Sequence, residues 1–329
     1  MDFNISSSLL EKIWDTIADK GISALLRPWQ MKRENKARLE CLRDERLTMV
    51  KIEAEVKQLQ ASLGKGDDAD AKTVSQVTEL VSETVTANLR EIVREEISVA
   101  KAVCYAGEYV NAEKVEDEKP AEVPTEEWLN KWKKRVREFT DEEALMWWGR
   151  ILAGEFASPG RFSYKFLDWM SCIDSKDAQL VLQLMGNVFG DMYYNGKNVA
   201  GKAPLTFGEL LELQELGVIQ GVETFGIKMT YKTDIEGSFQ KALLSANGKE
   251  MILVEHPDPS KILEINDAYG LTRIGKEVKM LCGAVMNSDM VQILGRHIVA
   301  KGFAVYHADI TFAKGNHIRF ENKMRIEEP

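Results

Sequence analysis

Residues 146–163 read MWWGRILAGEFASPGRFS, and this stretch decides how the central part of the chain folds. Thr140 and Glu143 lie just upstream at capping-box spacing, in which a hydroxyl and a carboxylate each bind a free backbone N–H group. Apolar residues then recur at intervals of three and four, which predicts a helix over residues 141–156. The Ser-Pro-Gly sequence at residues 158–160 would end this helix and turn the chain.

The small residues of this stretch predict close helix packing. Glycine inside a helix costs about 1 kcal/mol relative to alanine, so the presence of both Gly149 and Gly154 indicates a steric need. Gly149 and Ala153 are four residues apart on one face, where they would let another helix approach closely. We therefore interpret the stretch as a packing device and not as a catalytic signature.

Glu155 has two readings within this stretch. It would act as a base or a metal ligand, or it would be a helix-end carboxylate paired with Arg150, Arg161 or the free N–H groups at Ser163. No second carboxylate or histidine lies nearby at the spacing of a metal site or an acid–base pair. The pattern favours the structural role.

The N-terminal part is predicted to consist of long helices. Residues 8–30 carry apolar positions at helical spacing, Pro28 would bend this helix, and Trp14 and Trp29 flank its apolar face. Basic residues follow to residue 38, so the helix would either lie on a membrane or pack in a helical bundle or coiled coil. Because its polar face also contains acidic residues, which anionic lipid disfavours, the bundle is the favoured alternative.

The C-terminal part is predicted to mix strands with helices, one of which begins at a capping box of Thr206 and Glu209 and another at Thr272. Residues 205–219 read LTFGELLELQELGVI before a strand-like segment, a pattern compatible with a winged helix. Glu209, Glu212 and Glu215 would repel phosphate, so nucleic-acid binding through this helix is an alternative that is not favoured. The end of the chain alternates like a β-hairpin that turns at residues 314–316.

Together these patterns predict a mainly α fold with a smaller α+β C-terminal domain. It would have long N-terminal helices, a central helical bundle and a winged-helix-like end. The predicted parts are an N-terminal helix and long helical hairpin at residues 1–111, an acidic linker at 112–124, a central helical domain at 125–190 and an α+β domain at 191–329. The first helix of the central domain is predicted to begin at Thr125.

Composition narrows the class of protein. The net charge of −9 makes nucleic-acid binding depend on a local basic patch. The 4 cysteines are far apart without a C-x-x-C pair, which argues against a zinc or redox site, and no cofactor is predicted. The N-terminus lacks a signal-peptide pattern, and no window reaches the about 20 apolar residues of a membrane span. We therefore expect a cytoplasmic protein.

Catalytic chemistry has one candidate pair. His307 and Asp309 are two residues apart, so alternation in a strand places both side chains on one face. No nucleophile motif accompanies them, and the chain lacks the G-x-x-x-x-G-K-[ST] pattern of a phosphate loop. An enzyme of unrecognised type is therefore a less favoured alternative.

WWGRILAGE at residues 147–155, followed by PGRFS at 159–163, resembles the W-x-x-I-L-A-G-E and P-G-x-[FY]-S motif of an uncharacterised bacterial domain family. A tryptophan helix after an acidic linker and an N-terminal P-W-Q-x-x-R element are also similar to that family. A related group is described as alpha-type abortive-infection proteins, which implies phage defence. The motif residues, to which we assign a structural role, are Trp147, Trp148, Gly149, Ile151, Leu152, Ala153, Gly154, Glu155, Pro159, Gly160, Phe162 and Ser163. The residues expected to make interactions are Trp14, Pro28, Trp29 and Arg33.

These observations favour a non-enzymatic bacterial or prophage interaction protein. Its C-terminal domain would sense a protein partner, while its N-terminal helices would self-associate or touch the inner membrane peripherally through residues 8–38. The role in phage defence is implied by the resemblance. A DNA-binding regulator and an enzyme of unrecognised type are the alternatives.

Overall fold

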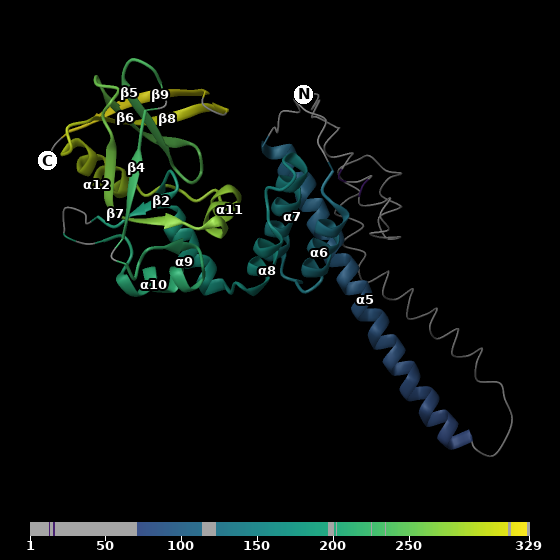
Figure 1. Cartoon of the computed structure of the whole chain (residues 1–329). Coiled ribbons are helices and arrows are strands. Elements are labelled where there is room, and N and C mark those ends of the chain that lie inside the picture. Colours follow the sequence, from purple (N-terminus) through teal and green to yellow (C-terminus); the bar gives the residue numbers. More distant parts are fainter. Residues whose placement is uncertain are drawn as a thin grey trace. The chain divides into compact units, whose positions relative to one another are not determined.

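The computed structural model places the chain in two compact units, residues 1–168 and 169–329 (Figure 1). The residues that the structure describes are 13, 16, 71–113, 123–196, 201, 203–224, 226–233, 235–314 and 317–327. Apart from residues 13 and 16, the predicted N-terminal helix at 8–30 and the charged segment after it lie outside this set.

Helices make up the described part of the first unit. They are α5 (Ala71–Glu113), α6 (Glu126–Val136), α7 (Glu142–Ala157) and α8 (Tyr164–Cys172), which ends within the second unit. One face of α5 packs against α7. The buried residues of that face recur at intervals of three and four and are Val99, Ala102, Val103, Ala106 and Val110.

Short polar side chains set the helix starts in this unit. Thr125 begins α6 as predicted, since its hydroxyl accepts a hydrogen bond from the backbone N–H of Trp128 at 3.3 Å. The capping box predicted at Thr140 is wrong by one residue. The Asp141 carboxylate accepts from the backbone N–H of Ala144 at 2.9 Å and begins α7. A carboxylate serves well there because it also interacts with the positive end of the helix dipole.

The second unit contains two antiparallel sheets. The first sheet has the order β1-β2-β7-β3, with β4 also pairing with β7, and the second has the order β5-β6-β8-β9. The strands of the first sheet are β1 (Val188–Phe189), β2 (Met192–Tyr194), β3 (Ile219–Gln220), β4 (Ile227–Tyr231) and β7 (Leu263–Leu271). Those of the second sheet are β5 (Phe239–Leu244), β6 (Glu250–His256), β8 (Ala304–Lys314) and β9 (His317–Ile326).

Helices α9 (Ser175–Met185), α10 (Phe207–Glu215), α11 (Arg273–Leu281) and α12 (Ser288–Val299) complete the second unit. The capping box predicted for α10 is confirmed, because Thr206 and Glu209 each bind the other's backbone N–H group. The predicted start of α11 at Thr272 is also confirmed, since its hydroxyl accepts from the backbone N–H of Gly275 at 3.1 Å.

One apolar core joins both sheets and α12. On the second sheet, Ile252, Val254 and Val305 belong to this core, and we call the face that carries them the inner face. Met251, Leu253 and Ala308 alternate with these residues along the strands and form a separate small cluster. They mark the opposite face of the sheet, which we call the outer face. None of the described helices combines the length and the apolar character needed to cross a membrane.

The prediction of a mainly α fold with a winged-helix-like end is wrong. The described residues contain 9 strands in two antiparallel sheets, and the second unit is rich in β-structure. The polar composition of residues 190–204 predicts a loop, yet Met192–Tyr194 form the very short strand β2, which pairs with β1 after a turn at Gly190. The two residues of β3 looked like the end of α10, yet they pair with β7 and form no wing.

Candidate functional site

Glu155 organises the turn that follows α7. Its two carboxylate oxygens accept hydrogen bonds from the backbone N–H groups of Gly160, at 2.6 Å, and Phe162, at 2.9 Å. Because Glu155 is only 2% exposed, these donors compensate for the burial of its charge. Gly160 has a φ of 83°, a conformation that favours glycine. The carboxylate is therefore engaged in closing the turn.

Two indole groups of α6 bind the backbone of the motif. Trp128 donates from Nε1 to the carbonyl of Phe162 at 2.8 Å, and Trp132 donates from Nε1 to the carbonyl of Trp148 at 3.1 Å. The Trp132 and Trp148 rings are fully buried. These aromatic residues thus fix the turn and α7 against α6 and supply much of the core of the first unit.

Glycines allow the close contacts of α7. A Cβ built at Gly149 would lie 2.7 Å from the backbone oxygen of Ala102 and 2.8 Å from the backbone nitrogen of Ala106, both on α5. A Cβ at Gly154 would lie 2.7 Å from the ring of Phe162. A Cβ at either position would therefore lie closer to these neighbouring atoms than van der Waals packing tolerates. The two glycines therefore meet the steric need that the sequence indicated.

The remaining motif residues offer little free chemistry. Trp147 is half-buried, and the guanidinium carbon of Arg150 lies 4.6 Å from the centre of its ring. Pro159 is exposed in the turn, while Ile151, Leu152 and Ala153 are buried. The residues expected to make N-terminal interactions, all outside the described part of the chain, are Trp14, Pro28, Trp29 and Arg33.

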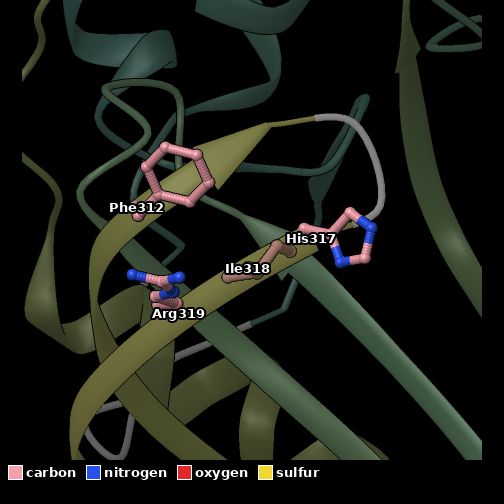
Figure 2. Close-up of a pocket in the computed structure, with 4 residues that line it drawn as sticks. All are labelled: Phe312, His317, Ile318 and Arg319. Atoms are coloured by element: carbon pink, nitrogen blue, oxygen red, sulfur yellow. The ribbon is translucent and has the colours of Figure 1, made fainter.

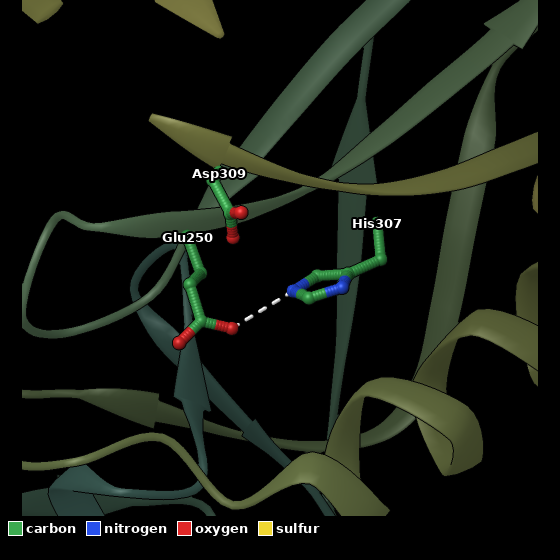
Figure 3. Close-up of side chains that lie close together, drawn as sticks. All are labelled: Glu250, His307 and Asp309. Carbon is green, nitrogen blue, oxygen red and sulfur yellow. Dashed lines mark hydrogen bonds and ion pairs between the residues drawn. The ribbon is translucent and has the colours of Figure 1, made fainter. Parts of the chain in front are cut away.

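The second unit brings together three polar side chains with metal-binding chemistry (Figure 3). They are Glu250 on β6 and His307 and Asp309 on β8. One candidate ligand atom from each lies within 4.8 Å of the other two, and all three residues are half-buried. His307 Nε2 and Glu250 Oε2 are 2.8 Å apart and share a hydrogen bond. Two carboxylates and one imidazole therefore converge on one point.

Strand pairing creates this cluster. Glu250 is directly opposite Asp309, and Ile252 is directly opposite His307, so all three polar side chains lie on the inner face, where the apolar core ends. The sequence pattern indicates His307 and Asp309 but not Glu250, because Glu250 and His307 are 57 positions apart in the chain. The alternation of residues 304–309 predicts a strand, but the sequence does not show the register of that strand with β6.

The outer face of the second sheet carries a small apolar cluster. Met251, Leu253 and Ala308 are buried at its centre. The partly buried residues packed around them are Ala242, Tyr306, Ile310 and Ile318. No residue of a described helix belongs to this cluster. Among the described residues, the apolar cluster on the outer face is therefore made of strand side chains.

The hairpin of β8 and β9 extends this surface. Phe320 is directly opposite Ile310 and is 38% exposed. Near the tip of the hairpin, four of the described residues line an open hollow (Figure 2). These are Phe312 on β8 and His317, Ile318 and Arg319 on β9, with the guanidinium carbon of Arg319 5.6 Å from the centre of the Phe312 ring.

Comparison with known proteins finds one match. Residues 108–198 match the family model described as a protein of unknown function, DUF2806. The matched stretch runs from the end of α5 past β2 and contains the whole motif at 147–163. This part of the chain is thus similar to an uncharacterised domain family, which supports the resemblance in its coarse form. No curated protein and no solved structure matches the chain.

Proposed function

We propose that this chain is a non-enzymatic cytoplasmic interaction protein of bacteria or their prophages, which binds a protein partner through the outer face of its second sheet. The apolar cluster on that face supports this proposal. Tyr306, Ile310 and Ile318 are only partly buried there, and Phe320 adds an exposed ring. Contiguous exposed apolar surface rimmed by polar residues is typical of protein-binding sites.

Charge and strand order indicate the chemistry of the partner. β9 is an edge strand of its sheet, so the backbone N–H and C=O groups on its side away from β8 can pair with an added strand. It carries Arg319, Lys323 and Arg325 against Glu321, although the whole chain has a net charge of −9. A partner that presents an extended segment with apolar and acidic side chains fits this edge best.

A comparison of two aspartate variants tests the binding surface. Phe320→Asp places a charge on the outer face, while Phe207→Asp places one on α10 at a side chain that is 60% exposed. The full-length wild type and both variants would be used as bait in bacterial lysate, with bound proteins quantified by mass spectrometry. We expect a partner that Phe320→Asp loses and Phe207→Asp retains, and whose binding weakens as salt rises.

The binding site on that partner can then be mapped. Hydrogen exchange should show protection of β9 and of one acidic, extended segment of the partner when the two proteins bind. Equal capture by both variants, or protection confined to another surface of this chain, would show that the outer face is not the binding site.

The resemblance to abortive-infection proteins supports a narrower proposal, that the interaction serves phage defence. In it the N-terminal helices self-associate or touch the inner membrane through residues 8–38. Phage plating on cells that express the wild type or Phe320→Asp tests this. We expect protection by the wild type alone. Failure of the wild type to protect against a broad phage panel would refute the defence role and leave the binding result standing.

A further inference from the structure

The cluster of Glu250, His307 and Asp309 has the chemistry of a metal site. We propose that it binds a divalent transition-metal ion of the zinc class, through the imidazole of His307 and one oxygen from each carboxylate. The three donor atoms lie within 4.8 Å of one another. Donors that share a zinc ion at bond lengths of about 2.1 Å lie roughly 3.4 Å apart in tetrahedral geometry. Small side-chain rotations therefore bring this set to coordination distance.

The hydrogen bond within the cluster marks where the ion would lie. His307 Nε2 and Glu250 Oε2 already face each other at 2.8 Å (Figure 3). A metal ion would take the place of the proton between them, which leaves to water, and would widen their separation. The neutral imidazole then carries its single proton on Nδ1 after exchange with water, so that Nε2 can bind the ion.

Repulsion between carboxylates is a second, independent reason to place a cation at this point. Glu250 is directly opposite Asp309 across β6 and β8, and Asp309 is directly opposite Glu321 across β8 and β9. Like charges directly opposite one another destabilise a sheet. Among the residues whose side chains the structure describes, no lysine or arginine forms an ion pair with Glu250, Asp309 or Glu321. A bound cation would offset this row of negative charge.

The surroundings hold two of the ligands in position. The Asn322 side-chain amide donates to Asp309 Oδ2 at 2.7 Å, which orients that carboxylate. His307 is directly opposite the buried Ile252 and is two residues from the buried Val305, so its ring lies at the edge of the apolar core. Ligands oriented by neighbouring groups and partly shielded from water bind metal more tightly.

The donor set selects the class of ion. Imidazole suits zinc and its first-row neighbours, whereas magnesium and calcium prefer more numerous oxygen ligands. Three protein ligands also leave a coordination position for water or for a side chain of another molecule. The site lies on the inner face, opposite the outer-face surface, so its test is independent of the proposed partner binding.

Titration of the full-length, tag-free protein with ZnCl2 and CoCl2 tests the proposal. Calorimetry would measure affinity, and the visible spectrum of bound Co²⁺ would show whether nitrogen and oxygen or thiolate ligands surround the ion. The informative variants are His307→Gln and Asp309→Asn. The matched control is His317→Gln, an exposed histidine on the same hairpin. Thermal melting and circular dichroism would confirm that each variant folds.

We expect one ion per chain, a Co²⁺ spectrum of nitrogen and oxygen ligands, and at least about 10-fold weaker binding in both informative variants. His317→Gln should bind as the wild type does. If one of the two informative variants fails to fold, the metal affinity of the other still tests the proposal. Absence of binding, a thiolate spectrum, or affinity unchanged in a folded His307→Gln or Asp309→Asn protein would overturn the proposal.

Discussion

One methyl group is enough to test the contact between α5 and α7. In Gly149→Ala the added Cβ would lie 2.7–2.8 Å from the backbone of Ala102 and Ala106 and from the Cβ of Tyr105. Those distances are about 0.7 Å short of the optimal separation of packed carbon atoms. None of the three atoms is the far end of a flexible side chain, so relief requires one helix to move away from the other.

The expected free-energy change is the difference between two effects. Overpacking of a well-packed core costs about 1–3 kcal/mol, and alanine gains about 1 kcal/mol over glycine in helix propensity. Gly149→Ala should therefore destabilise the first unit by up to about 2 kcal/mol. The control is Gly208→Ala in α10, where a Cβ meets nothing within 4 Å. There the propensity gain acts alone, so the second unit should become more stable by about 0.5–1 kcal/mol.

Two signals separate the units in this experiment. Tryptophan fluorescence reports mainly on the first unit, because six of the 7 tryptophans lie in residues 1–168, namely Trp14, Trp29, Trp128, Trp132, Trp147 and Trp148. Calorimetry reports on both units. A rise in the melting temperature of Gly149→Ala, like that expected of the Gly208→Ala control, would refute the steric conflict, because the added methyl group would then have found room.

Other substitutions test further parts of the first unit. Trp148→Ala should lower the free energy of unfolding by about 3–5 kcal/mol, as measured by urea denaturation followed by circular dichroism, because the Trp148 ring is fully buried. A loss below about 0.5 kcal/mol would contradict this. Glu155→Ala leaves two backbone donors without their acceptor and should cost roughly 2–4 kcal/mol, which an unchanged urea midpoint would exclude. Hydrogen bonds from Lys131 and Arg135 lower the pKa of Asp168. That stabilisation is present above the unfolded-state pKa of about 4 and is lost as the pH falls through the lower folded-state pKa. Asp168→Asn should therefore reduce the acid-side fall in melting temperature, and an unchanged fall would count against the pairing.

Local signals made several helix starts predictable. Thr125, Thr206 and Thr272 each bind a backbone N–H group within three residues, so a short window of sequence contains the donor and the acceptor. The same window failed at Thr140, because Asp141 beside it offers a competing and better oxygen. Helix starts that depend on side chains within one helical turn can be predicted from the sequence. Neighbouring residues of similar chemistry limit the accuracy of the predicted start to about one residue.

Sheet structure depended on partners far along the chain. β7 pairs with β2, β3 and β4. The local sequence at residues 188–194 and 219–220 does not indicate that these short strands will pair with a strand far along the chain. A two- or three-residue strand has too few positions for alternation to appear. The same limit concealed the Glu250 cluster, whose geometry depends on the register between β6 and β8.

The arrangement of the motif indicates where function is to be sought. Both oxygens of Glu155, two indole N–H groups of α6 and the glycine contacts of α7 all hold the fold, which leaves the motif few groups to bind anything else. The family match at residues 108–198 covers this framework except for the residues of α5 that Gly149 contacts. It ends before the outer-face surface and before the Glu250 cluster, both of which belong to later strands. Shared framework therefore does not require shared ligands. A protein that matches the same domain but lacks the equivalents of Glu250, His307 and Asp309 should fold its helical unit and bind no metal ion at this position.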